Sequence, residues 1–359
     1  MHIKKLFLMV ISIIVVGCSA DDSSNTTSYI GAGSEYSITF SDSSGTFDLT
    51  ESDSSLAVSG THTTLPSGFK KLTIGSVSGG GSGGPSVGDA AYGIDIPGVV
   101  FLLKPLEVGS EIIAMVTKGS CPTSDFSMNW IITSIDRGDK FSDSCHITSS
   151  ARGTDALGTF SYTHSTQTGK LPKLFDICDN TVTENVNLGT ISCSSGIGSP
   201  SEDTDAKMYL TLNGGSIVKL SADNQIIVGL PVNRISTLAD MAGDYIGLVM
   251  VNETTTSNVY TVKATAETTG IFSFDEINPD SGDVISSNNV NGDATMVAIN
   301  SPTDGFSTGT FKLDASSTNL EVSCMSNQNI NDSGKNFIFC IGQDPFDVDN
   351  MVNMLLISK

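Results

Sequence analysis

The chain has 359 residues and carries 39 acidic against 18 basic side chains, a formal net charge of −21 at pH 7. This length accommodates two domains or one large β domain. The excess of negative charge excludes a nucleic-acid-binding function, which needs a basic surface, and it also opposes binding of the polypeptide to anionic lipid head groups.

The first 18 residues have the order of an export signal. A basic start at residues 2–5 is followed by an apolar run at residues 6–16 (LFLMVISIIVV), and Gly17 precedes Cys18. A run this short cannot cross a bilayer core, which needs about 20 helical residues, but it has the size of the hydrophobic region of a secretory signal. The segment resembles the signal peptides of bacterial lipoproteins, whose lipobox ends in Gly or Ala before the Cys that is acylated.

The resemblance implies that residues 1–17 are removed as a signal peptide and that Cys18 becomes a lipidated N-terminus. Two or more acyl chains, such as palmitate, anchor a protein stably to a membrane. Residues 18–28 continue as a small, polar and acidic segment, which predicts a flexible tether. Residue 19 is Ser, whereas Asp at this place favours inner-membrane retention in enterobacterial lipoproteins. We therefore expect a lipid-anchored protein of the bacterial cell envelope, with the outer membrane favoured and the periplasmic or surface face left open.

Residues 29–230 are expected to form an N-terminal β domain. Within it, residues 78–88 are rich in Gly and Ser and predict a loop. Residues 80–84 (GGSGG) match the G-x-S-x-G pattern of a nucleophilic serine, but that pattern needs a strand before it and a helix after it, and neither is evident around Ser82. The loop is therefore not interpreted as a catalytic site.

The other candidates for chemistry in this part of the chain are isolated. The histidines of the mature chain, His62, His146 and His164, have no acidic residue and nucleophile in a recognisable arrangement, and no H-E-x-x-H pattern occurs. Residues 137–139 (RGD) spell a cell-adhesion tripeptide but fit an ordinary turn, and the single Trp130 fits a core position. We therefore predict no catalytic residues and no enzymatic activity.

Hydrophobic alternation with a period of two recurs along the chain, whereas long helical stripes are absent, so strands are predicted throughout. Clusters of Gly, Asn, Asp, Ser and Thr separate these runs at a spacing of roughly 8–12 residues, as in sandwiches and barrels. The strand faces expected to be buried are Phe126, Met128, Trp130 and Ile132; Tyr260, Val262 and Ala264; and Phe272 and Phe274.

Six cysteines follow Cys18, and an even number in an exported chain predicts disulfides. Pairing sequence neighbours puts turn-forming residues at the midpoint of two pairs, at residues 331–334 (NDSG) and at the polar residues 183–185. A bridge across such a hairpin closes a loop of about 15 residues and contributes roughly 3 kcal/mol. The predicted disulfides are Cys178–Cys193 and Cys324–Cys340, with Cys121–Cys145 as a third pair whose midpoint falls beside a predicted strand.

The two hairpin pairs lie in similar surroundings, which predicts a partial internal repeat. Each copy starts with Gly-Thr-Phe (residues 158–160 and 309–311) and ends in an apolar strand (residues 208–212 and 354–358). An acidic loop precedes the last strand in both copies. Clustered carboxylates on a loop can bind Ca²⁺ through oxygen ligands, although solvated acidic loops have the same composition. The possible calcium ligands are Glu202, Asp203 and Asp205 in the first copy and Asp344, Asp347 and Asp349 in the second.

A break in the pattern near residue 231 divides the chain. An apolar strand at residues 226–230 ends at Pro231, and a new apolar run starts at Gly243. Residues 231–242 are therefore expected to be a linker with one short helix, and residues 243–359 a C-terminal β domain of about eight strands. The predicted fold is all-β, with two antiparallel units of barrel or sandwich type that are stapled by disulfides and share the partial repeat.

These features favour a non-enzymatic binding or structural module held at a membrane by its lipid, with an unidentified protein or small-molecule ligand and no cofactor other than the possible calcium. The alternative is a lipocalin-like carrier, because a barrel of about eight strands can enclose one small ligand. A carrier needs an unfilled, mostly apolar cavity of ~300 Å³ or more in the C-terminal barrel, which separates the two hypotheses.

Overall fold

The structure is a computed structural model that describes most of the chain from Thr26 onward. The described residues are 26–31, 36–52, 55–79, 84–96, 98–104, 106, 112–117, 119–132, 155–176, 182–183, 186–202, 206–210, 216–219, 226–231, 235, 237–252, 257–285, 290, 292–298, 305–313, 319–328, 334–343 and 351–359.

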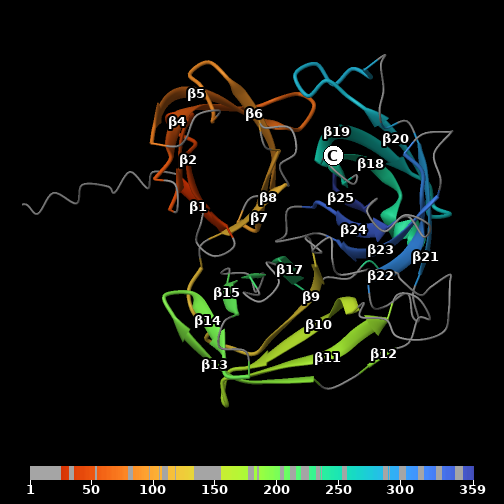
Figure 1. The fold of residues 1–359 in the computed structure, drawn as a ribbon. Coiled ribbons are helices and arrows are strands. Elements are labelled where there is room, and N and C mark those ends of the chain that lie inside the picture. Colours follow the sequence, from red (N-terminus) through yellow and green to blue (C-terminus); the bar gives the residue numbers. More distant parts are fainter. Residues whose placement is uncertain are drawn as a thin grey trace, which may run out of the picture.

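The first unit is a closed barrel of eight antiparallel strands, in which each strand pairs with its neighbours in the sequence. The first strand also pairs with the eighth, at Tyr29↔Thr117 and Gly31↔Met115, and this pairing closes the barrel (Figure 1). We call this unit the first ring. Its strands are β1 (Thr26–Gly31), β2 (Tyr36–Ser41), β3 (Thr46–Glu51), β4 (Ala57–Thr64), β5 (Lys70–Ser78), β6 (Ala90–Ile96), β7 (Val100–Lys104) and β8 (Ile113–Thr117).

The last unit, which we call the third ring, is a second closed barrel with the same up-and-down order of eight strands. Its first and last strands pair from Tyr245↔Ser358 to Asn252↔Met351. A short 3₁₀ helix, η2 (Leu238–Met241), precedes it. The strands are β18 (Gly243–Asn252), β19 (Ser257–Ala266), β20 (Ile271–Glu276), β21 (Asp293–Ala298), β22 (Phe306–Phe311), β23 (Leu320–Asn327), β24 (Phe337–Gln343) and β25 (Met351–Ser358).

Nine strands between these barrels form one antiparallel sheet, which we call the second ring. They are β9 (Phe126–Ile132), β10 (Asp155–Thr163), β11 (Thr168–Asp176), β12 (Val182–Thr183), β13 (Val186–Ser194), β14 (Ile197–Pro200), β15 (Lys207–Leu210), β16 (Ser216–Lys219) and β17 (Ile226–Pro231).

The nine strands of the second ring occupy only eight strand positions in the sheet, which we call lines. Both β12 and β13 pair with β11 in one continuous register, at Phe175↔Val182 and Leu171↔Val186, so they occupy a single line. The edge strand β10 pairs with β11 as well as with β9, and β9 in turn pairs with β17. The circuit of eight lines therefore closes in chain order, as it does in the two barrels.

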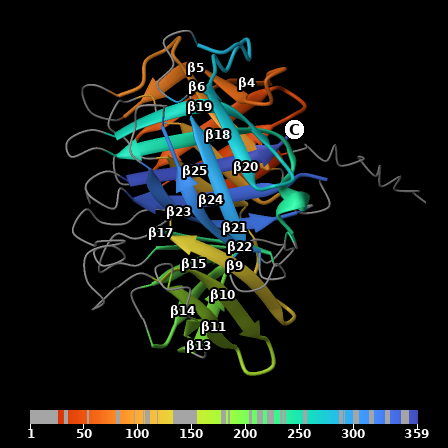
Figure 2. The same cartoon turned by 90° about the vertical axis from the view of Figure 1, so that its right-hand side faces the viewer.

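Each ring buries one face of its strands in an interior of its own, because successive side chains of a strand point to opposite faces. The opposite faces of several strands meet between the rings and form a central cluster to which all three rings contribute. On β24, for example, Phe337, Phe339 and Ile341 belong to the central cluster, whereas Ile338 and Cys340 belong to the interior of the third ring. Figures 1 and 2 show the second ring packed beneath the other two. The rings therefore share one core.

The predicted all-β, antiparallel, disulfide-stapled fold is confirmed. Of the expected strand faces, Met128 and Trp130 lie in the interior of the second ring, and Val262, Ala264, Phe272 and Phe274 in that of the third. The structure divides residues 29–230, expected as one domain, between the first and second rings. β17 ends at Pro231 and β18 begins at Gly243. Among the described residues no helix has the length and apolar character needed to cross a bilayer.

The repeated sequence landmarks occupy different positions in their rings. The first Gly-Thr-Phe (residues 158–160) lies on the second strand line of its ring, whereas the second (residues 309–311) lies on the fifth strand of its barrel. The closing strands are the sixth line and the eighth strand. The landmarks therefore do not mark equivalent strands, and the repetition that the structure contains is that of the eight-strand circuit itself.

Aromatic side chains occupy the interior of the third ring, where a carrier would need its cavity. Tyr245, Phe272, Phe274 and Phe311 are at most 2% exposed. Their ring centroids form a chain of neighbours 5.4 to 6.2 Å apart, within the range of favourable aromatic contacts. These described residues form a packed core, so the lipocalin-like alternative gains no support from this barrel.

Candidate functional site

The first ring contains a cluster of polar side chains in its otherwise apolar interior. Asp95 on β6 accepts a hydrogen bond from the Tyr29 hydroxyl on β1, with 2.5 Å between the oxygens. The other carboxylate oxygen lies 2.6 Å from Nζ of Lys70 on β5. The Lys70 ammonium also lies 4.2 Å from the ring centre of Phe40 on β2. Four strands therefore meet at one buried ion pair.

Burial sets the chemistry of this cluster. The side chains of Lys70 and Asp95 are only 9% and 14% exposed, so neither charge is well solvated and each depends on the other. Burial first, and then the negative charge of Asp95, raise the pKa of Tyr29 far above its usual value, so Tyr29 stays protonated and serves as a donor. Donors occupy both carboxylate oxygens, so the arrangement suits a clamp between strands better than acid–base catalysis.

A second polar site joins the first and third rings, and we call it the inter-ring latch. It consists of Asp280, in the turn after β20, together with Lys71 and Tyr92 on β5 and β6. The Lys71 ammonium donates to Asp280 Oδ1 at 2.8 Å, and the Tyr92 hydroxyl donates to Oδ2 at 2.6 Å. Beside it, the Ser67 hydroxyl donates to the Pro279 carbonyl at 2.5 Å. The latch therefore ties β5, β6 and the segment before β5 to the turn after β20.

The latch makes stability depend on pH. Hydrogen bonds from Lys71 and then from Tyr92 hold the pKa of Asp280 below its ordinary value. A depressed carboxyl pKa stabilises the folded state above the unfolded-state value of about 3.9, and that contribution disappears as the pH falls through the folded-state pKa. We expect Asp280→Asn to reduce the loss of stability below about pH 4, as measured by urea unfolding at a series of pH values.

The matched control for this measurement is Asp283→Asn, which changes an exposed carboxylate in the same turn. It should keep the pH dependence of the wild type. If the free energy of unfolding falls equally below about pH 4 in both variants, the role assigned to Asp280 is contradicted.

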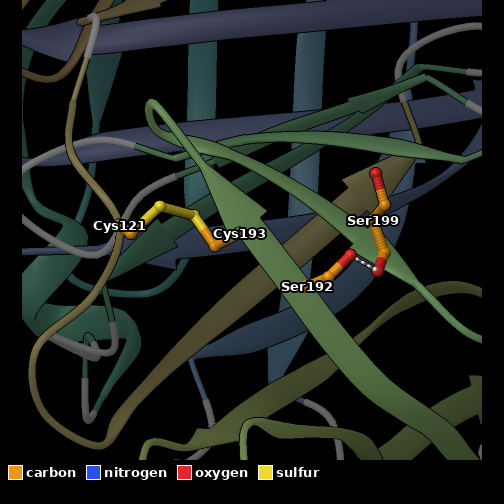
Figure 3. Close-up of a disulfide and its surroundings, with 4 residues drawn as sticks. All are labelled: Cys121, Ser192, Cys193 and Ser199. Atoms are coloured by element: carbon orange, nitrogen blue, oxygen red, sulfur yellow. Dashed lines mark hydrogen bonds between the residues drawn. A yellow bond between two sulfur atoms is a disulfide. The ribbon is translucent and has the colours of Figure 1, made fainter.

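Two disulfides lie among the described residues. Cys324 and Cys340 face each other on β23 and β24, with 4.0 Å between their Cα atoms, which confirms the predicted pair. The other bond joins Cys121, in the segment before β9, to Cys193 on β13, with 5.7 Å between the Cα atoms (Figure 3). The predicted pairs Cys178–Cys193 and Cys121–Cys145 are therefore wrong. Cys145 and Cys178 lie outside the described residues.

The course of the second ring explains this correction. The polar residues 183–185 were expected to form a hairpin turn, but Val182 and Val186 on either side of them pair with β11 in one register. The turn instead follows Cys193, where Ser195 and Gly196 have φ values of 53° and 82°, as a tight hairpin between β13 and β14 requires. A Cβ on Gly196 would lie 2.3 Å from the Gly119 carbonyl oxygen. The hairpin therefore lies directly against the segment that carries Cys121.

The proposed calcium ligands fall almost entirely outside the described residues. Glu202 is described and is exposed, two residues after the end of β14. Asp203, Asp205, Asp344, Asp347 and Asp349 lie outside the description. Within the described parts of the chain, no group of three or more His, Cys, Asp and Glu side chains is arranged to hold a metal ion. Calcium binding stays a prediction.

The isolated candidates are not brought together into a catalytic arrangement in the described part of the chain. The His62 ring nitrogen lies 3.3 Å from the Ser41 carbonyl, and the ring packs against Phe40. His164 lies in the exposed turn after β10, where its backbone N–H donates to Asp125. Trp130 is a core residue, as predicted. Cys18, Ser82, His146 and residues 137–139 lie outside the described residues.

Sequence reasoning missed Tyr29, Lys70 and Asp95. A signal was present for Asp95, because residues 93–96 (GIDI) place a carboxylate between two apolar side chains of a strand. Such a residue faces either solvent or an interior with a compensating charge, and the sequence does not decide between these. The compensating charge, Lys70, comes from the neighbouring strand β5, next to the pair Lys70↔Gly93, whereas the donor Tyr29 comes from β1 across the ring.

Comparisons with known proteins give distant matches. No protein-family model matches the sequence, and no curated protein matches it. Two crystal structures of the vaccine antigen transferrin binding protein B from Haemophilus parasuis Hp5, a single and a double mutant, match 90% and 91% of this chain at 12% and 10% identity, with a TM-score of 0.26 in both cases. The chain spans just under two thirds of their length, 65% and 66%. A TM-score this low does not establish a common fold.

Proposed function

We propose that the mature chain is a non-enzymatic interaction module of the bacterial cell envelope, anchored by lipid on Cys18. The observation that supports this proposal most strongly is the packing of three rings, each with an apolar cluster of its own in its interior, around one shared cluster. Such a scaffold is rigid, and binding residues on loops are positioned best by a rigid scaffold.

The position of β1 indicates which rim of the first ring lies near the membrane. β1 begins at Thr26, eight residues after Cys18. A flexible segment of that length reaches roughly 15 Å from end to end. The rim of the first ring where β1 begins is then close to the membrane. It is the same rim that carries residues 42–45, which are polar, and the buried cluster of Lys70 and Asp95.

The opposite rim of the first ring then faces away from the membrane. Two of the exposed large hydrophobic side chains lie there, Val87 between β5 and β6 at 67% exposure and Leu106 between β7 and β8 at 41%. Contiguous exposed apolar patches mark contact sites, whereas single exposed hydrophobic residues are ordinary. The two side chains lie on successive loops of the same rim, which makes this rim the best candidate for a contact surface. We assign the binding surface to this rim.

The anchor is tested by Cys18→Ser. We expect this variant to leave the membrane fraction for the soluble fraction, because the acyl chains would be the attachment of the mature protein. The measurement is fractionation followed by mass spectrometry of the N-terminal peptide, with Ser19→Ala as the control that keeps the modified cysteine. Equal membrane retention of Cys18→Ser after removal of residues 1–17 would overturn the proposal.

The binding surface is tested by crosslinking in envelope fractions, followed by affinity purification of the lipidated protein. A partner recovered with the wild type should be lost with Val87→Asp and Leu106→Asp. It should be retained with Ile271→Asp, which places the same charge at a 41% exposed site on the third ring. Loss of the partner with all three variants would contradict the assignment of the binding surface to the outward rim.

A further inference from the structure

The segment that leads into the third ring closes one end of that barrel. Thr237 and Asp240 form a capping box around η2, in which the Asp240 backbone N–H donates to Thr237 Oγ1 at 3.3 Å and the Thr237 N–H donates to the Asp240 carboxylate at 3.1 Å. Met241, at the end of η2, is buried in the ring interior, and its carbonyl accepts a hydrogen bond from the Tyr245 hydroxyl at 2.6 Å. Asn336 donates from its side chain to the Asp240 carbonyl at 3.1 Å. Helix η2 is thus fastened over the barrel end.

A small hollow remains beneath this cover, with room for about one water molecule. It lies between η2 and the strands β22 and β23, and two of the residues that line it are Ser307 and Ser326. Both serines are 2% exposed. Among the described residues, neither hydroxyl has a hydrogen-bond partner. A buried hydroxyl without a partner carries a desolvation penalty, so two of them beside one hollow need an explanation.

The strand register puts both hydroxyls on the same face. Ser307 pairs directly with Cys324, and Ser326 lies two residues further along β23, so the two serines are diagonal neighbours. Diagonal neighbours have Cα atoms about 7–8 Å apart, with the Cβ atoms closer. One water molecule placed between them can therefore bond to both hydroxyls. The backbone of Ser326 is already engaged, because its N–H donates to the Gly305 carbonyl at 2.7 Å and its carbonyl accepts from Ile235 at 3.3 Å.

We propose that this hollow is a specific site for an ordered water molecule that bridges the hydroxyls of Ser307 and Ser326 beneath η2. The hollow has the size of one water, and its polar groups are neutral hydroxyls that both donate and accept. The remaining side chains around it are uncharged, which disfavours an ion. The water completes the hydrogen bonding of β22 and β23 at the covered end of the barrel.

A double-mutant cycle on the full mature chain tests the site. If water bridges the hydroxyls, Ser307→Ala and Ser326→Ala each break the bridge, so each should lower Tm by about 1–3 °C. The double variant should lower Tm by less than the sum, since the second substitution removes a group whose bridge is already lost. Ser273→Ala, at an exposed position of β20 in the same ring, is the control and should leave Tm unchanged.

A change of Tm in the opposite direction indicates that the hollow contains no water. If the hydroxyls lack any partner, each substitution removes a desolvation penalty, so Tm should stay constant or rise and the two effects should add. A Tm that stays constant or rises overturns the proposal, and so do effects of the two substitutions that add. A high-resolution crystal structure provides the direct measurement: density for one water between the two hydroxyls in the wild type, absent in the double variant, is the result expected, and an empty hollow in the wild type contradicts the site.

Discussion

Replacing Asp95 with Ala is expected to lower the free energy of unfolding by about 3–5 kcal/mol, the range measured when one member of a buried ion pair is removed. The substitution leaves the Lys70 ammonium inside the first ring with no carboxylate beside it, at 9% exposure. It also removes the acceptor of the Tyr29 hydroxyl, which adds the desolvation penalty of a buried donor. The expected loss is a large fraction of the stability of an ordinary domain.

The measurement is urea unfolding followed by circular dichroism, with the fluorescence of Trp130 as a second probe that reports on the second ring. The control is Asp275→Ala, which breaks the pair of Lys263 and Asp275 at 3.7 Å, where both side chains are at least 37% exposed. Exposed pairs of this kind contribute about 0–1 kcal/mol. A loss for Asp95→Ala no greater than that for Asp275→Ala would show that the buried cluster is not the clamp described here.

Mild reduction of the folded protein is expected to open Cys121–Cys193 and to leave Cys324–Cys340 intact. Cys324 and Cys340 are 0% exposed inside the third ring, whereas Cys121 and Cys193 are partly exposed. Thiol–disulfide exchange needs direct approach of a thiolate to one sulfur, so access decides the order. The bond that opens first closes a loop with a sequence separation of 72, and by loop-closure entropy its loss lowers the free energy of unfolding by roughly 4 kcal/mol.

The order of opening is measured by alkylating free thiols after graded reduction and identifying the labelled peptides by mass spectrometry. Under denaturing conditions both bonds should open together, which controls for intrinsic reactivity. Labelling of Cys324 at the same rate as Cys193 in the folded protein would contradict the expected order. Cys121→Ser with Cys193→Ser provides the matched stability measurement.

Local patterns predicted individual strands well, but not the way the strands join. The alternation of Met128 and Trp130, or of Phe272 and Phe274, depends on neighbouring residues alone and was recovered from the sequence. The division of residues 29–230 into two rings depends on pairings such as β1 with β8 and β9 with β17, which connect segments far apart in the chain. A local signal for that division existed at Gly119 and Pro122, which lie between β8 and β9, but turns between paired strands have the same composition.

The cysteine and charged residues show the same limit. Cys324–Cys340 is a bond between adjacent strands, so the turn at its midpoint indicated it correctly. Cys121–Cys193 depends on a hairpin folding back onto the segment before β9, a contact with no counterpart in residue spacing. Lys70 and Asp95 lie on paired strands, close to the pair Lys70↔Gly93, but Tyr29 on β1 reaches Asp95 only across the closed ring, a contact that residue spacing does not indicate.

Closure of the first and third rings affects how the protein behaves when many copies are anchored close together on one membrane. Every described strand of these two rings has a hydrogen-bonded neighbour on both sides, so the described sheets have no edge strand. Such edges are templates onto which a second chain adds as a further strand, the first step of β aggregation. Lipid anchoring would confine many copies to a thin layer and raise their encounter frequency. Circular sheets allow this density without edge-to-edge polymerisation.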